Sequence, residues 1–190
     1  MPQTKILLDT NTYLRLAQSI RPLLGIEFGK EKFTLYIHKE IETELNRSSR
    51  LQNKFNWIER EEYKNNRKKR LIIKKCKQVD IENTYDFIWE YQKNKKLNLS
   101  REDIFCIATA LELNIKLVTD DKNMITTCKE FEVDILTTLE LMKLMQDNNH
   151  IDVELIKQIT EYWKYSNDLP TNLMDFEKDI KRLFGIILNR

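Results

Sequence analysis

The chain has 190 residues and a net charge of +2, which is enough for one domain of ordinary size with or without a small appendage. Hydrophobic residues make up 41% and charged residues 33%, as in soluble globular proteins, and no apolar run approaches the roughly 20 residues that a membrane span needs. Two histidines argue against a histidine-rich zinc site, and neither GxGxxG nor GxxxxGK[ST] occurs, which argues against these two kinds of nucleotide binding.

The first half of the chain predicts two strands, each followed by a helix. Residues 5 to 8 predict the first strand, because Ile6, Leu7 and Leu8 are a short apolar run typical of a buried parallel strand, which stops at Asp9. Residues 11 to 18 predict a short helix. The β-rich run FTLYI, residues 33 to 37, predicts a second strand, and a helix begins within HKEIETELNR. Residues 50 to 96 have a helical and polar pattern.

The second half alternates helices with strands. Ser100 is a natural N-cap for the helix that contains DIFCIATALEL, and IKLVT (115 to 119) and VDIL (133 to 136) predict buried strands. A closing helix ends near residue 146, so we expect one domain over 1–146 and a helical extension over 147–190, with helices at 152–165 and 171–185. Alternating strands and helices predict an α/β fold with a mostly parallel sheet that is covered on both faces.

The predicted order of strands and helices places four acidic residues at one edge of the sheet. Asp9 and Asp121 each follow a strand, Asp103 opens the helix that precedes a strand, and Glu44 lies in the helix after the second strand. Like charges this close repel, so either some carry protons or a cation lies between them. Oxygen ligands suit Mg²⁺ or Mn²⁺, and such ions would polarise a phosphodiester and activate water. Taken singly, each carboxylate could equally cap a helix or face solvent.

Four separated motifs resemble the PIN-domain family, over about residues 4 to 145. ILLDTNTYL, IHKEIETEL, SREDIFCIATALELN and IKLVTDDKNM occur in the family's order and match its acids at Asp9, Glu44, Asp103 and Asp121. Asn11 and Thr119 match positions that line the family's site and orient its ligands. Asp120, beside Asp121, either adds a ligand or faces solvent. The resemblance implies a three-layer α/β/α fold and a Mg²⁺- or Mn²⁺-dependent nuclease, commonly an endoribonuclease.

Many small bacterial members of this family are toxins that an antitoxin holds and that act as dimers. The resemblance therefore implies RNA as the substrate, with an antitoxin and a second copy of the chain as candidate partners. This chain differs from the smallest of those toxins in its longer middle region, residues 47 to 100, and in its C-terminal extension. The extension carries enough apolar residues to pack on its own domain, on a second subunit or on a partner. We expect Cys76, Cys106 and Cys128 to be free thiols in a cytoplasmic protein without a signal peptide.

The positive charge is concentrated in residues 47 to 77, where twelve Lys and Arg stand against three Glu, a net charge of +9. Such a stretch favours a polyanionic partner, because neutralising phosphates releases counterions. We expect the interleaved aromatics Trp57 and Tyr63 to pack in the core. The residues expected to bind nucleic acid are Arg67, Lys68, Lys69, Arg70, Lys74 and Lys75.

Three alternatives to a ribonuclease stay open. A nuclease for single-stranded DNA would use the same chemistry, since the mechanism does not need the ribose 2′-hydroxyl. A PIN-like binding module without cleavage would also fit, although all four acids are present. A haloacid-dehalogenase-like phosphatase fits worse, because Asn11 stands where its second Asp is expected and Asp103 and Glu44 would have no role.

Overall fold

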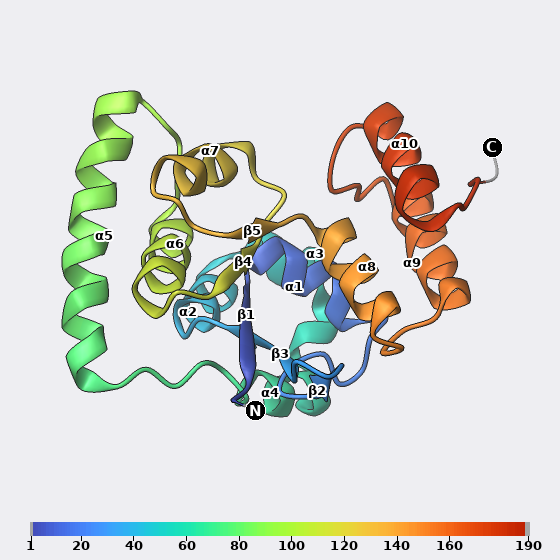
Figure 1. Cartoon of the computed structure of the whole chain (residues 1–190), viewed down its shortest axis with the longest axis horizontal. Coiled ribbons are helices and arrows are strands. Elements are labelled where there is room, and N and C mark those ends of the chain that lie inside the picture. The colour runs from blue at the N-terminus through green and yellow to red at the C-terminus, as the bar shows by residue number, and fades with distance from the viewer. Residues whose placement is uncertain (1, 189–190) are drawn as a thin grey trace.

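The computed structural model describes residues 2 to 188, which form a five-stranded sheet between two layers of helices (Figure 1). The strand order is β2-β3-β1-β4-β5, and only β2 runs antiparallel to its neighbour. The strands are β1 (Thr4–Leu8), β2 (Glu27–Phe28), β3 (Phe33–Ile37), β4 (Lys116–Val118) and β5 (Ile135–Leu136). The predicted α/β class with a mostly parallel central sheet is confirmed.

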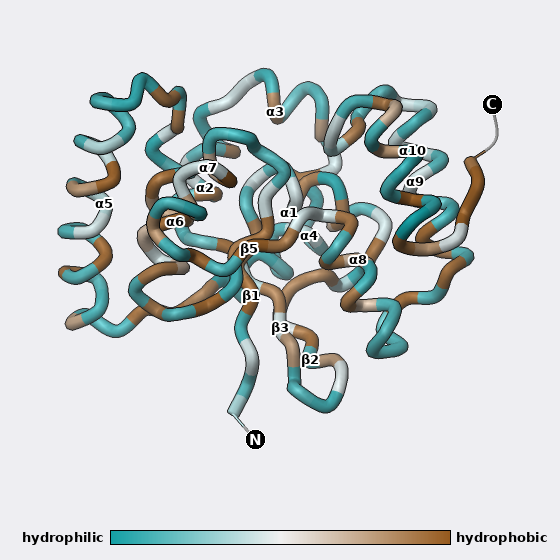
Figure 2. The backbone as a smooth tube through the Cα atoms, turned by 45° about the horizontal axis from the view of Figure 1, so that its top comes forward, coloured by the Kyte–Doolittle hydropathy of each residue, from teal (hydrophilic) through white to brown (hydrophobic). Residues whose placement is uncertain are grey.

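Alternation along β1 divides the core into two clusters, one on each face of the sheet. Ile6 and Leu8 face one cluster, and Leu7 between them faces the other, as the two-residue period of a strand requires. Figure 2 shows brown, hydrophobic stretches at β3 and β5 in the middle of the molecule.

The helices fall on the two faces in the same way. The face of Ile6 is covered by α1 (Thr10–Ala17), α2 (Glu40–Arg47), α8 (Thr138–Asp147), α9 (Val153–Ser166) and α10 (Leu173–Phe184). The face of Leu7 is covered by α5 (Lys75–Lys95), α6 (Arg101–Leu113) and α7 (Lys122–Glu130). Figure 1 shows α5 and α10 at opposite ends of the molecule. No helix among the described residues is long and apolar enough to cross a membrane.

Residues 50 to 96 are helical over most of their length, as their pattern predicts, but the helices are interrupted. They form α3 (Ser49–Lys54), the 3₁₀ helix η1 (Asn56–Glu59) and α4 (Glu61–Arg67), then a non-helical segment before α5. In that segment Leu71 is buried, and its N–H donates to the carbonyl of Ile37 at 3.1 Å. The tertiary bond to the end of β3 replaces the intrahelical bond that the local pattern predicts.

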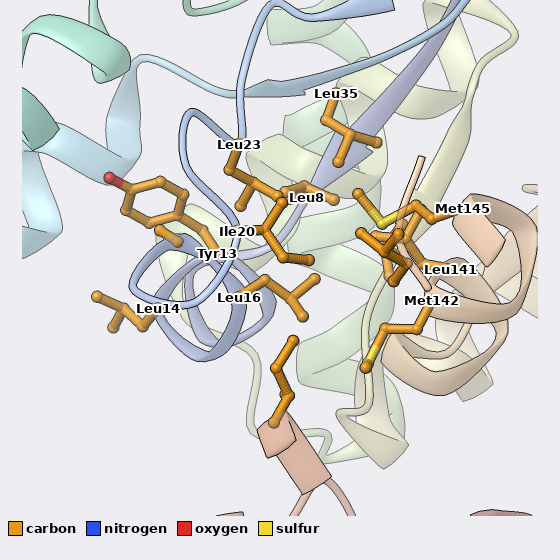
Figure 3. Close-up of a cluster of buried hydrophobic side chains, with 14 of the residues drawn as sticks. Leu8, Tyr13, Leu14, Leu16, Ile20, Leu23, Leu35, Leu141, Met142 and Met145 are labelled. Atoms are coloured by element: carbon orange, nitrogen blue, oxygen red, sulfur yellow. The ribbon is translucent and has the colours of Figure 1, made fainter. Parts of the chain in front are cut away.

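The C-terminal extension packs on the rest of its own chain. Trp163 of α9 and Phe176 of α10 are buried in the cluster that also contains Leu141, Met142 and Met145 of α8. Figure 3 shows these three α8 side chains in one cluster with Leu16 and Ile20, so α8 packs against α1 and the residues after it as well as against the extension. The two predicted helices are present, and the boundary at residue 146 stays a prediction.

Candidate functional site

Asp9 lies directly after β1 and caps the N-terminus of α1. Its Oδ1 accepts a hydrogen bond from the Thr12 N–H at 2.6 Å, which satisfies one of the free amides of that helix start. Burial raises the pKa of Asp9 to about 6, and hydrogen bonds from Thr119 and Thr12 offset only part of this effect. The nearby charge of Asp120 is a smaller cause of this raised value. Asp9 is thus a buried carboxyl that forms no ion pair with residues 2 to 188.

Glu44 comes from α2, the helix that follows β3. The hydroxyl of Thr10, at the start of α1, donates to its Oε2 and so ties α2 to the residue after Asp9. Burial raises the pKa of Glu44, the Thr10 bond lowers it, and the charges of Glu102 and Asp103 raise it. This acid therefore lies among other acids and is partly buried.

Asp103 and Asp121 each cap the N-terminus of a helix, and the two acids lie near each other. Asp103 forms a capping box with Ser100, in which its Oδ2 accepts from the Ser100 N–H at 2.8 Å. Asp121 caps α7, and its Oδ1 accepts from the Met124 N–H at 2.8 Å. Burial raises the pKa of Asp103, the bonds from Ser100 lower it, and the charge of Asp121 is the next cause that raises it.

The parallel strands bring these four acids to one edge. Asp9 and Asp121 follow the carboxyl ends of β1 and β4, and α6 begins at that same edge because it runs back towards β4. The buried thiol of Cys106 in α6 lies close enough to three of these acids for their charges to affect its pKa. Its pKa is raised well above 9 by burial first, and then by the charges of Asp103, Asp9 and Glu44.

The four carboxylates are neighbours, but they are not arranged as a finished metal cage. Among residues 2 to 188, no three His, Cys, Asp or Glu side chains form a group that could hold a metal ion. Each of Asp9, Asp103 and Asp121 holds a helix N-terminus, so the helix-capping alternative for these residues describes real contacts. Capping and ligation are compatible, since a carboxylate has about four acceptor positions and the cap uses one or two.

Three neighbouring residues were also expected at the site. Thr119 accepts from the Asp121 N–H at 3.1 Å and hydrogen-bonds Asp9, so it contacts both acids. Asn11 is exposed on α1 and lines a pocket that also contains Glu44. Asp120 has a third role besides the two that were expected: it pairs with Arg15 at 3.0 Å and accepts from the N–H and hydroxyl of Thr138. It joins β4, α1 and α8.

The basic stretch divides into a buried residue and exposed ones. Arg67 is only 2% exposed, and its Nε donates to Glu42 Oε1 at 2.6 Å while its Nη1 donates to the Ile58 carbonyl at 2.9 Å. The expectation that Arg67 binds nucleic acid is therefore corrected: its guanidinium holds α2 to η1. The five others are exposed: Lys68, Lys69, Arg70, Lys74 and Lys75. Trp57 and Tyr63 are buried, as expected.

Sequence reasoning missed Glu102, Arg15, Arg50 and Lys54. Glu102 raises the pKa of both Glu44 and Asp103, and its place in the first turn of α6 was a local signal that could have found it. Arg15 lies one helical turn after Asn11, which puts it on the same face of α1. No local signal marks Lys54 and Arg50, because they line a pocket that Asp168 of the C-terminal extension completes.

No known protein family matches this sequence, and no curated protein is similar to it. Among solved structures, the chain is similar to one described as the crystal structure of FitAcB from Neisseria gonorrhoeae, with a TM-score of 0.44 and 17% sequence identity. The similarity covers 70% of this chain and 97% of that chain. A likeness this low shows neither a shared family nor a shared activity.

Proposed function

We propose that this protein is a Mg²⁺- or Mn²⁺-dependent endoribonuclease of the PIN type, with Asp9, Glu44, Asp103 and Asp121 as its acidic centre. The observation that carries the proposal is the convergence of these acids, which match the family's motifs and come from four elements. Burial raises the pKa of Asp9, Glu44 and Asp103, and the charges of neighbouring acids raise each of them as well. Such a group of carboxylates is stabilised in its ionised form by a cation.

The donor chemistry fits a hard divalent ion. All four side chains offer carboxylate oxygens, and within the described part of the chain no hydrogen bond is made by Asp103 Oδ1, Asp121 Oδ2 or Glu44 Oε1. When bound, the ion would polarise a phosphodiester and lower the pKa of water. Thr119 and Thr10 would then hold Asp121 and Glu44 in orientation, as supporting hydrogen bonds do around metal ligands.

The motifs support three finer proposals. These are cellular RNA as substrate, an antitoxin that restrains the enzyme, and assembly as a homodimer in the cytoplasm. The exposed lysines and arginines after α4 support the first, because a polyanion needs positive surface near an acidic site. The antitoxin and the dimer have no support from a described contact.

A cleavage assay tests the proposal. Purified protein is incubated with labelled single-stranded RNA or matched DNA, in the presence of Mn²⁺, Mg²⁺ or EDTA. Asp121→Asn is the test variant, because Asn is as good an N-cap as Asp and should preserve α7 while it removes a charged ligand. Asp134→Asn is the matched control, since Asp134 is exposed beside the amino end of β4.

We expect the wild type and Asp134→Asn to cut RNA with either metal and to stop in EDTA, and Asp121→Asn to lose at least about a hundredfold in rate. Cleavage of DNA alone would keep the chemistry and change the substrate. Binding of RNA without cleavage under every condition would replace the nuclease by a binding module.

A further inference from the structure

A polar pocket of about 360 Å³ adjoins the acidic centre and shares Glu44 and Asn11 with it. Its basic lining comes from two helices: Arg15 from α1, and Arg50 and Lys54 from α3. The volume lies within the range of small-ligand pockets and gives room for about one nucleotide. Positive side chains therefore line the same pocket as Glu44, one of the four acids.

The C-terminal extension forms one wall of this pocket. Asp168, in the loop between α9 and α10, lines it and pairs with Lys54, with 3.0 Å between Lys54 Nζ and Asp168 Oδ1. The next residue in the loop accepts from Arg15, whose Nη2 lies 3.3 Å from the Leu169 carbonyl oxygen. Two oxygen acceptors of the extension thus lie against two of the pocket's cations.

The third cation has no such acceptor. Arg50 is exposed, and no ion pair to it exists within residues 2 to 188. Guanidinium groups with free donors are well suited to phosphate, which they can bind through two parallel hydrogen bonds. Lys54 is half exposed, so a phosphate could displace Asp168 from it without unfolding the loop.

We propose that this pocket binds a backbone phosphate of a single-stranded nucleic acid through Arg50 and Lys54, and that Asp168 competes with that phosphate for Lys54. The proposal rests on the function proposed above, because the pocket would hold the strand beside the acids that cut it. Each phosphate contact contributes to affinity through counterion release, whatever the base. The Asp168 carboxylate acts as an internal anion that keeps the site selective for a polyanion over weaker anions.

The test measures binding of a short fluorescein-labelled single-stranded RNA by fluorescence anisotropy, with the full chain in EDTA and over a series of salt concentrations. The variants are Lys54→Ala, Arg50→Ala and Asp168→Asn. The matched controls are Lys116→Ala and Asp134→Asn, since Lys116 and Asp134 form a comparable ion pair at 3.2 Å at the opposite edge of the sheet. Thermal melting confirms that each variant is folded, which we expect because exposed ion pairs add little stability.

We expect Lys54→Ala and Arg50→Ala each to weaken binding and to reduce the slope of log K against log salt by about 0.7, the value for one lost contact to a single strand. Asp168→Asn should tighten binding by about two- to fivefold, the range that an exposed ion pair can contribute. The two controls should leave both the affinity and the slope unchanged. A general effect of charge would instead change the controls equally.

Unchanged affinity and slope in Lys54→Ala and Arg50→Ala, or weaker binding by Asp168→Asn, would overturn the assignment of this pocket. A parallel cleavage assay of the wild type with Mn²⁺ separates this result from the nuclease proposal. If the wild type cleaves RNA and the pocket variants bind it as tightly as the wild type does, only the pocket proposal is rejected. If the variants change RNA binding as expected but the wild type does not cleave, the nuclease proposal is rejected and the pocket proposal is kept.

Discussion

The burial of the Asp9 carboxyl makes the free energy of unfolding depend on pH. Its pKa is near 3.8 in an unfolded chain and about 6 in the folded protein, so between these values the folded state binds more protons. The folded state is therefore more stable at low pH, where Asp9 is protonated, and this stability is lost as the pH rises through 6. At neutral pH the ionised Asp9 therefore destabilises the fold by about 3 kcal/mol at most.

Asp9→Asn should consequently stabilise the protein without metal. Asn retains the cap on α1 and removes the buried charge, so we expect the free energy of unfolding in EDTA at neutral pH to rise by about 1–3 kcal/mol. The gain should vanish below about pH 4, where Asp9 is protonated. Denaturant unfolding over a pH series measures both effects.

Added Mg²⁺ or Mn²⁺ gives the complementary result. We expect either ion to raise the melting temperature of the wild type, because a ligand of the folded state stabilises it, and to leave that of Asp9→Asn nearly unchanged. Destabilisation by Asp9→Asn in EDTA, or an equal metal response in both proteins, would contradict the role given to this residue.

His38 should affect the pH dependence in the opposite direction. It is buried at the end of β3 and stacks on Phe105, with ring centroids 5.5 Å apart. Burial and, to a smaller extent, the charge of Lys39 lower its pKa to about 4. Because the unfolded chain then binds more protons between pH 6.5 and 4, stability falls as the pH falls through that window, by about 3 kcal/mol at most.

His38→Gln should remove this loss. Its free energy of unfolding should depend less on pH between 6.5 and 4 than that of the wild type, as followed by denaturant titration at each pH. His150→Gln is the control, since His150 is only partly buried and its pKa, also lowered by burial, should contribute less. An unchanged slope in His38→Gln would show that His38 is protonated in the folded protein.

At the scale of elements, two capping boxes of the same kind have different positions relative to the site. Ser100 and Asp103 begin α6, while Thr137 and Glu140 begin α8. Each box satisfies free amides of its helix, so its loss should cost about 1 kcal/mol. Only the first box includes an acid of the proposed centre.

Ser100→Ala and Thr137→Ala should therefore lose similar stability and differ in activity. We expect Ser100→Ala to reduce metal-dependent cleavage about tenfold, because the bond from the Asp103 N–H to the Ser100 hydroxyl is lost and the helix turn that carries Asp103 is held less firmly, and Thr137→Ala to retain it. Stability from denaturant titration and rates at saturating Mn²⁺ distinguish the two effects. Equal loss of activity in both would mean that Ser100 acts only through stability.

The elements that sequence patterns predicted correctly are those with local signals. Apolar runs marked β1 and β3, and Ser100 marked the start of α6, because strand burial and capping are decided within a few residues. The convergence of Asp9, Asp103 and Asp121 also followed, since the direction of parallel strands fixes which edge each acid reaches.

The features that were missed depend on partners far along the chain. Arg67 is buried because Glu42, 25 residues earlier, neutralises it, and nothing in the local basic pattern distinguishes it from the exposed Lys68. The pairing of Lys54 with Asp168 joins residues 114 positions apart. A local pattern states which side chains are charged, and only the packing of α9 and α10 decides which of them meet.

At the scale of the whole molecule, the extension should behave as part of the core. Trp163 is buried against Phe176, with ring centroids 6.4 Å apart, whereas Tyr165 on the same helix is 91% exposed. We expect Trp163→Ala to lower the free energy of unfolding by about 3–5 kcal/mol and Tyr165→Ala to change it by less than about 0.5 kcal/mol. A small effect of Trp163→Ala in denaturant unfolding would mean that the extension folds separately from residues 1 to 146.

The shared core also has a consequence for the order of events during synthesis. Leu141, Met142 and Met145 leave the ribosome before Trp163 and Phe176, which cover them in the finished protein. At translation rates of about 5–20 residues per second, the stretch from α8 to the end of α10 takes about 2–8 s to make. During that interval the nascent chain presents an apolar face to its surroundings, and the loop that carries Asp168 has not yet closed over Lys54. The protein is thus most open to chaperones, and its basic pocket least restrained, while it is still being translated.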